Sequence, residues 1–251
     1  MPRPRRARPH NPDSAADAAD STAVAPFTSP DLSGLSASAR PARPPARVTR
    51  GPGALRGNPT DEAASAPRII GGELRHRRLE FTPDARTRPM KDRVRESLFD
   101  LIGTDVKGAI AIDLFAGSGA IGFEALSRGA ARAIFVEYHF PTADVLRRSG
   151  HGLGVSDRID VRSGDVLLWA KRMPAIPTSS PWLVFLSPPW SFFSERWNEL
   201  LSLTQAMLRA APPRSTFVVE ADMEFDRRLL PDADAWEARP MPPAVLYLRI
   251  Q

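Results

Sequence analysis

The chain of 251 residues contains no cysteine and only four histidines. The lack of cysteine excludes disulfide bonds, thiolate catalysis and zinc sites built on sulfur. The histidines are too scattered to form a metal-ligand pair: His10, His76, His139 and His151. No apolar run reaches the roughly 18 residues of a membrane span, and the amino terminus lacks the apolar segment of a secretory signal. We therefore expect a cytoplasmic protein that uses no metal and enters no membrane.

Charge and composition set the first part of the chain apart. The formal net charge is +5, which favours a polyanionic partner because Lys and Arg release counterions when they bind phosphates. Residues 1–67 are rich in Pro, Ala, Ser, Arg and Gly, with Phe27 as the only aromatic. Such a segment buries too little surface to offset its ordering entropy. We predict a disordered arm that could touch RNA; a solvated tail without a role and an organelle transit peptide are the alternatives.

A basic segment follows at residues 68–104. RIIGGELRHRRLEF predicts a β-hairpin with strands at 68–74 and 78–81. After a turn at 87–89, apolar spacing predicts an amphipathic helix over 91–102 with one buried stripe: Val94, Leu98, Leu101 and Ile102. We expect an RNA-binding appendage that contacts phosphates through arginines: Arg75, Arg77, Arg78, Arg88 and Arg93. A solvated face whose arginine stems pack on the surface is the alternative.

From residue 105 to the end, short apolar runs alternate with helical stretches. The runs predict seven strands, at 110–114, 133–136, 159–162, 182–186, 216–220, 236–239 and 245–250. Helices are expected between them, at 119–127, 141–149, 166–173 and 195–209. This alternation indicates an α/β, Rossmann-like fold, with a mostly parallel seven-stranded sheet and helices on both faces. Ligands of such sheets bind at the carboxyl ends of the strands.

A glycine-rich loop follows the first of these strands. In the segment IAIDLFAGSGAIG the strand ends at Asp113, and Gly117, Gly119 and Gly122 form a GxGxxG pattern. Glycine lets the backbone turn sharply and approach a ligand closely. By itself this pattern fits a dinucleotide as well as other nucleoside cofactors.

Three carboxylates favour S-adenosylmethionine over a dinucleotide. Asp113 at the first strand tip would repel a pyrophosphate but would attract a cationic methionine group. Glu137 ends the next strand, 20 residues after Gly117, where it can accept from ribose hydroxyls; both ligands contain that ribose. Asp165 follows the third strand and can accept from an adenine amine, or it can simply cap the next helix.

The fourth strand ends in Ser187-Pro188-Pro189-Trp190. Two prolines make a rigid backbone that lacks donors and whose carbonyls stay free to accept. An aromatic beside them can stack on a base taken out of its helix. The alternative is a proline turn with Trp190 packed in the core.

These segments together resemble one known family. The chain resembles the RsmD-type family of 16S ribosomal RNA guanine-N2 methyltransferases over residues 68–251. Four segments carry the resemblance: RIIGGELRHRRLEF, TRPMKDRVRESLF, DLFAGSGAIGFEALSRGAARAIFVE and LVFLSPPW. It implies a class I methyltransferase fold, S-adenosylmethionine as methyl donor and, as partner, small-subunit ribosomal RNA or the small ribosomal subunit; we expect a monomer. It also implies a cofactor site comprising Asp113, Phe115, Gly117, Gly119, Glu137 and Asp165, with Ser187, Pro188, Pro189 and Trp190 at the target base.

The sequence departs from the family pattern at the proposed catalytic motif. The family usually has Asp-Pro-Pro-Tyr or Asp-Pro-Pro-Phe where this chain has Ser187 to Trp190. We expect the Ser187 hydroxyl and the Pro188 carbonyl to accept from the target amine and Trp190 to stack on the base. Two alternatives remain: a binding or assembly protein that has lost turnover, and a nicotinamide-dependent oxidoreductase.

Overall fold

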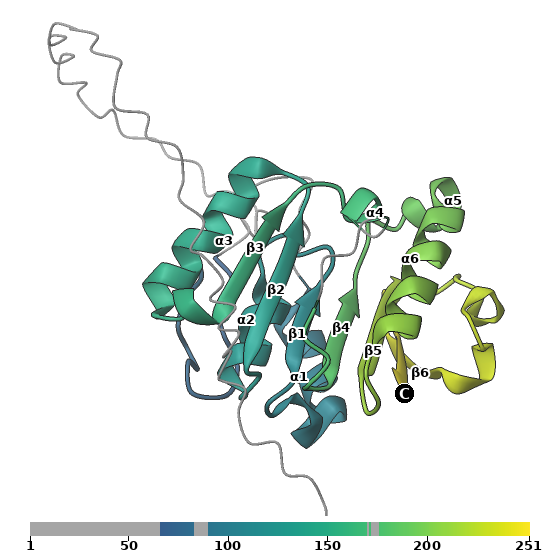
Figure 1. The fold of residues 1–251 in the computed structure, drawn as a ribbon, viewed down its shortest axis with the longest axis horizontal. Helices are drawn as coiled ribbons and strands as arrows, with labels where there is room; N and C mark the ends of the chain where they lie inside the picture. The colour runs from purple at the N-terminus through teal and green to yellow at the C-terminus, as the bar shows by residue number, and fades with distance from the viewer. Residues whose placement is uncertain (1–65, 83–89, 170, 172–175) are drawn as a thin grey trace, which may run out of the picture. The chain divides into compact units, whose positions relative to one another are not determined.

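A seven-stranded sheet forms the centre of the fold (Figure 1). The computed structural model describes residues 66–82, 90–169, 171 and 176–251. The strand order is β3-β2-β1-β4-β5-β7-β6, with strands β1 Ile110–Asp113, β2 Arg132–Glu137, β3 Ile159–Ser163, β4 Trp182–Leu186, β5 Thr216–Asp222, β6 Glu237–Met241 and β7 Ala244–Ile250. Pairing is parallel from β3 through β5, whereas β7 runs antiparallel to both β5 and β6. All seven predicted strands are confirmed.

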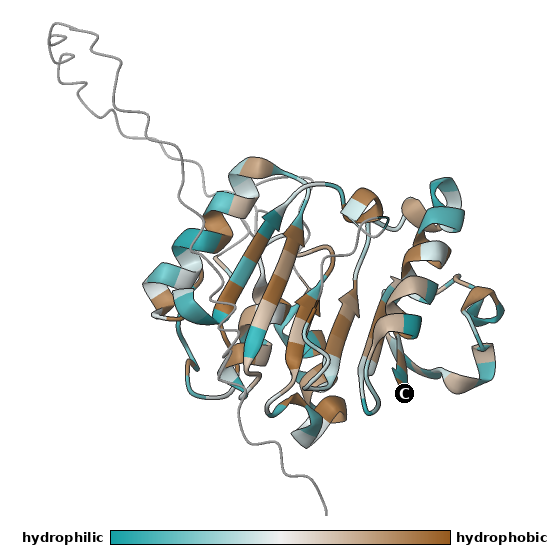
Figure 2. Cartoon of the chain, in the orientation of Figure 1, coloured by the Kyte–Doolittle hydropathy of each residue, from teal (hydrophilic) through white to brown (hydrophobic). Residues whose placement is uncertain are grey.

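Helices cover both faces of this sheet, as predicted. The α-helices are α1 Asp92–Ile102, α2 Ala120–Ser127, α3 Phe140–Leu153, α4 Val166–Trp169, α5 Phe192–Glu195 and α6 Trp197–Ala210. The 3-10 turns are η1 Gly103–Val106, η2 Ser156–Arg158, η4 Arg227–Leu229 and η5 Ala233–Ala235. The central strands β1, β2 and β4 are apolar along most of their length (Figure 2) because both of their faces are buried.

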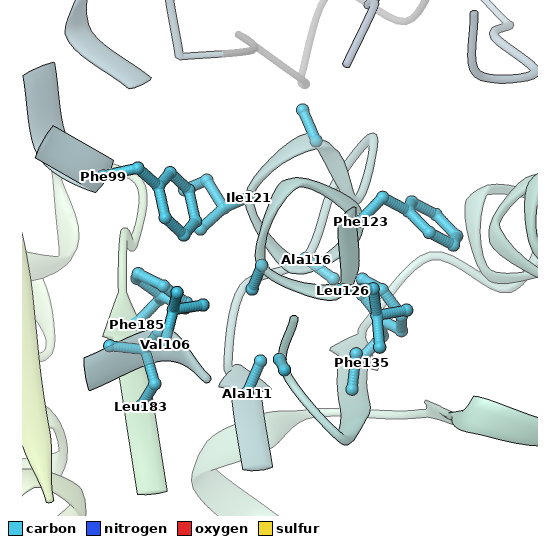
Figure 3. Close-up of a cluster of buried hydrophobic side chains, with 14 of the residues drawn as sticks. Phe99, Val106, Ala111, Ala116, Ile121, Phe123, Leu126, Phe135, Leu183 and Phe185 are labelled. Atoms are coloured by element: carbon cyan, nitrogen blue, oxygen red, sulfur yellow. The ribbon is translucent and has the colours of Figure 1, made fainter. Parts of the chain in front are cut away.

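Two hydrophobic clusters lie on the two faces. One joins the sheet to α1, α2 and α3, and in it Phe99 of α1 packs against Phe185 of β4 with ring centroids 6.0 Å apart (Figure 3). Phe123 of α2 meets Phe135 of β2 at 4.8 Å in the same cluster. The other cluster joins the opposite face to α4 and α6.

The predicted hairpin over residues 68–81 forms, but its pairing is shorter than expected. Its two arms meet in one antiparallel bridge, between Arg68 and Arg78, and the N–H groups of Ile69 and His76 donate across it to the carbonyls of Arg77 and Ile69 at 2.9 and 2.8 Å. Ile69 and Leu79 beside this bridge are buried in the same cluster as helix α1. The segment therefore shares its core with the sheet domain.

The pairing extends no further because the next backbone donors are used elsewhere. The N–H groups of Ile70 and Gly71 each donate to the Glu124 carboxylate of α2 at 2.8 Å. Gly72 has a φ of +78°, and a Cβ there would lie 1.9 Å from the Ser127 carbonyl oxygen. The segment is thus folded around the end of α2, and these donors are not available for a strand ladder.

A buried charge network holds this arrangement. The Glu124 carboxylate also accepts from Arg128 Nε at 2.8 Å and lies 3.6 Å from Nε of the fully buried Arg95. Arg95 donates in turn to the carbonyls of Arg68 (2.6 Å) and Met90 (3.1 Å). A buried charge is tolerated when it is paired and hydrogen-bonded in this way. The network ties the residues before α1 to the helix that follows the glycine loop.

Helix α1 forms where the apolar spacing predicted it, but its buried face is rotated. Leu101, expected in the stripe, is 41% exposed, whereas Phe99 is only 2% exposed. The rotation brings Phe99 onto Phe185 and Arg95 onto Glu124. Residues 1–65 of the predicted arm and the turn at 87–89, which includes Arg88, lie outside the described residues.

Candidate active site

Five parallel strands, β1 to β5, end at one edge of the sheet, and the glycine loop crosses that edge. Gly117 and Gly119 adopt φ values of 50° and 73°, a region that favours glycine. A Cβ at Gly119 would lie 2.4 Å from Leu146 Cδ2, and one at Gly122 would lie 2.3 Å from Phe135 Cε1. Gly117 and Gly119 shape the loop, while Gly122 allows α2 to pack closely on β2.

Asp113 ends β1 beneath this loop and is only 2% exposed. Burial raises the pKa of Asp113 to about 7, and the charges of Glu137 and Glu220 act in the same direction; backbone hydrogen bonds from Gly122 and Phe115 oppose the increase. Its Oδ2 atom is buried without a hydrogen-bond partner in the described part of the chain. A buried acceptor of this kind suits a cationic or hydrogen-donating ligand group.

Glu137, at the end of β2, is held in place by two backbone donors. Its Oε2 accepts from the Gly117 N–H at 2.7 Å and its Oε1 from the His139 N–H at 2.8 Å. Each carboxylate oxygen keeps a second lone pair. The side chain is therefore oriented beside the glycine loop and can still accept from a ligand.

Asp165 has structural partners on both of its oxygens. Oδ1 accepts from the Leu167 N–H at 2.8 Å and so caps α4, while Oδ2 lies 3.4 Å from Arg196 Nη1. The capping interpretation of Asp165 is confirmed, and its contact with adenine stays a prediction. Arg196 was missed from the sequence because it lies 31 residues away.

An aromatic contact joins the glycine loop to α5. Phe115 meets Phe192 edge to face at 6.2 Å, and the Arg196 guanidinium lies over the Phe192 ring at 5.0 Å. Arg196 thereby links two predicted cofactor residues, Phe115 and Asp165. No local pattern in the sequence could reveal this link, because it depends on where α5 packs.

The Ser187 to Trp190 segment leaves the sheet beside the glycine loop, at the end of β4. Ser187 is half-buried and Pro188 buried, whereas Trp190 is 36% exposed and so is not a core residue. The Pro189 carbonyl accepts from the Phe192 N–H at 2.9 Å. The described residues offer no hydrogen bond to the Pro188 carbonyl, which is free to accept.

The predicted phosphate contacts lie on the segment before α1 and on α1 itself. Arg75, Arg78 and Arg93 are exposed and form no ion pair with any described residue. Arg77 is also exposed but donates to the Gly152 carbonyl at 2.6 Å. Arg88 falls outside the described residues.

The described residues contain neither a group of three or more side chains suited to holding a metal ion nor a helix long and apolar enough to cross a membrane.

Comparison with known proteins identifies the family. The model of the family described as Conserved hypothetical protein 95 matches residues 67–238. The chain belongs to this family. The RsmD-type resemblance of the sequence is thereby confirmed, since family relatives with curated names include the ribosomal RNA small subunit methyltransferase D of Escherichia coli K12.

Two relatives are each similar to about half of the chain. The chain is 34% identical over 140 residues to the putative rRNA methyltransferase YlbH of Bacillus subtilis, covering 54% of this chain and 72% of that protein. It is 35% identical over 132 residues to the E. coli protein, covering 53% of this chain and 64% of that protein. The latter match therefore spans less than two thirds of its relative.

A solved structure of a family relative has the same architecture. The putative methyltransferase yhhF from Escherichia coli is 27% identical, with a TM-score of 0.58, and the match covers 74% of this chain and all of that one. The predicted class I methyltransferase fold is confirmed. The predictions of a methyltransferase with S-adenosylmethionine as donor agree with this family.

Proposed function

We propose that the chain is an S-adenosylmethionine-dependent methyltransferase that modifies the exocyclic N2 of a guanine in small-subunit ribosomal RNA. The observation that carries this proposal is the buried, unpartnered oxygen of Asp113 beneath a glycine loop; the neighbouring strand β4 leads into the Pro-Pro turn with the exposed Trp190. The names of the relatives support an RNA substrate.

The residues at the loop fit the chemistry of this cofactor. Asp113 would attract the cationic methionine end, Glu137 would accept from the ribose hydroxyls, and Asp165 would lie near the adenine. The tight contacts around Gly119 leave no room for a side chain in the loop. When bound, S-adenosylmethionine supplies an electrophilic methyl group attached to a positively charged sulfur.

The chain's own task is to align the target amine. Alignment of two reacting groups removes much of an entropic barrier, so no strong base is required. The free Pro188 carbonyl and the Ser187 hydroxyl can accept from the amine N–H groups, which favours a pyramidal nitrogen. Trp190 can stack on the flipped base.

The RNA backbone would be held by the exposed arginines before and within α1. Phosphate contacts position a nucleic acid without selecting a base. Arg75, Arg78 and Arg93 have no competing ion pairs among the described residues, so they suit this role. We propose that the protein acts as a monomer, in the cytoplasm, on the small ribosomal subunit or on its RNA.

Two measurements test the function. Transfer of tritium from labelled S-adenosylmethionine to small subunits from cells lacking this gene, followed by nucleoside analysis, should yield N2-methylguanine. In calorimetry, Glu137→Ala should weaken binding of S-adenosylhomocysteine by about 1–3 kcal/mol, because ligand and loop donors lose their acceptor. The exposed Glu96→Ala is the matched control. Preferential binding of NAD would overturn the proposal.

A second candidate is an RNA-binding or assembly protein that has kept the fold but lost turnover. Ser187, in place of the acid in the family motif, favours it. Cofactor and RNA binding without methyl transfer to any tested particle would establish this alternative.

A further inference from the structure

The residue beside Ser187 in the sheet is a carboxylate. Strands β4 and β5 pair in parallel, and the last registered pair is Leu186 with Val219. The next residues along the two strands are Ser187 and Glu220. Neighbouring strands lie about 4.8 Å apart, so the backbone of Glu220 lies about one strand spacing from the backbone of Ser187.

Strand parity places three polar residues on one face of the sheet. Ala111, Phe185 and Val218 belong to the cluster shared with α1 and α2. Side chains two residues apart along a strand point to the same face. The residues two positions further are Asp113, Glu220 and Ser187, the last of which directly follows β4; all three lie at the carboxyl ends of adjacent strands.

The electrostatics of Asp113 agree with this placement. Burial is the main cause of the raised pKa of Asp113, and the charge of Glu220 adds a small contribution in the same direction. Glu220 is half-buried, so its charge is only partly screened. The unpartnered Oδ2 of Asp113 on the same face independently indicates that a ligand group belongs there.

We propose that Glu220, reaching across from β5, is the carboxylate that accepts from the target amine, in place of the acid that the family motif carries at the position of Ser187. This inference rests on the proposed methyltransferase function. A serine hydroxyl is short and uncharged, whereas a glutamate on the adjacent strand has both the reach and the charge to hold an amine N–H.

The amine nitrogen uses its lone pair to bond the methyl carbon, and the carbon–sulfur bond breaks with its electron pair returning to sulfur. The extra proton on nitrogen passes to the Glu220 carboxylate and then to water. Ser187 and the Pro188 carbonyl remain secondary acceptors.

The first test compares Glu220→Gln with the natural chain in single-turnover methyl transfer. The rate should fall about 100- to 1000-fold, the usual effect of removing one preorganised transition-state partner. Affinity for S-adenosylhomocysteine should stay within about threefold, because Glu220 is not assigned to the cofactor. Glu224→Gln, an exposed acid four residues on, is the control and should transfer at the natural rate.

A second variant separates catalysis from folding. Ser187→Asp in the Glu220→Gln background restores a carboxylate from the adjacent strand and should recover at least tenfold of the lost rate. If Glu220→Gln alone is as fast as the natural chain, or if the double variant is no faster than the single one, Glu220 is not the acceptor. A natural chain that neither binds cofactor nor transfers methyl would instead refute the proposed function, and this inference with it.

Discussion

At the scale of single residues, three carboxylates at neighbouring strand ends differ in their burial and in their hydrogen-bond partners. Asp113 is buried with an unpartnered oxygen, and Glu137 is oriented by two backbone donors. Asp165 is occupied by a helix cap and by Arg196. Environment, more than residue type, decides which of them retains free capacity for a ligand.

Asp113 should make stability depend on pH. Its pKa is about 7 in the folded chain against 3.8 for an unperturbed aspartate, so the folded state keeps a proton that the unfolded state has released. The free energy of unfolding should therefore fall as pH rises from about 4 to about 7. At 1.36 kcal/mol per pKa unit, the loss is on the order of 4 kcal/mol.

Urea unfolding of Asp113→Asn measures this effect. The variant should match the natural chain near pH 4 and become relatively more stable towards pH 8, because its amide does not ionise. The exposed Asp105→Asn serves as control and should leave the slope unchanged. Equal pH dependence of Asp113→Asn and the natural chain would contradict the raised pKa.

At the scale of elements, helix α2 connects three parts of the site. The glycine loop precedes it, Gly122 lets it pack on Phe135 of β2, and Glu124 binds the backbone of Ile70 and Gly71. A displacement of α2 would disturb the cofactor loop and the basic segment together.

Two glycine substitutions test how tightly this helix packs. Gly122→Ala places a Cβ 2.3 Å from Phe135 Cε1 and should destabilise by about 1–3 kcal/mol through overpacking. Gly152→Ala in α3 meets nothing within 4 Å and should be neutral or stabilise by up to about 1 kcal/mol, because alanine favours helix. Urea midpoints of both variants provide the measurement. Equal midpoints would show that α2 can move away from β2 at little cost.

At the scale of the whole molecule, the exposed arginines before and within α1 give the RNA hypothesis its clearest test. Reversing both Arg75 and Arg78 to Glu should weaken RNA binding and make the salt dependence shallower by about one unit for each lost phosphate contact. Reversing Arg132 and Arg209 changes the net charge equally, but Arg132 begins β2 and Arg209 lies on α6, on the face away from α1.

Filter binding across a salt series distinguishes the two pairs. The Arg75 and Arg78 variant should lose affinity at low salt, whereas the Arg132 and Arg209 variant should bind nearly as the natural chain does. The opposite ranking would place the RNA surface elsewhere on the protein.

The sequence alone was enough to predict the seven strands, the glycine loop and the family. Buried parallel strands require continuous apolar runs, and a tight loop requires glycine at fixed positions. Both requirements are local, so they can be recognised in the sequence. The strand-end acids Asp113 and Glu137 could be found for the same reason.

Tertiary structure decided the features that depend on distant partners. The segment at 68–81 folds around α2 because its N–H groups find Glu124, more than 50 residues away. Asp165 pairs with Arg196 only because α6 packs beside α4, and Asp165 and Arg196 immediately precede these two helices. Glu220 ends the apolar run TFVVE as Asp113 ends IAID, but its position beside Ser187 follows from strand order. Sequence periodicity records which residues are buried, whereas only the packed sheet decides which of them are neighbours.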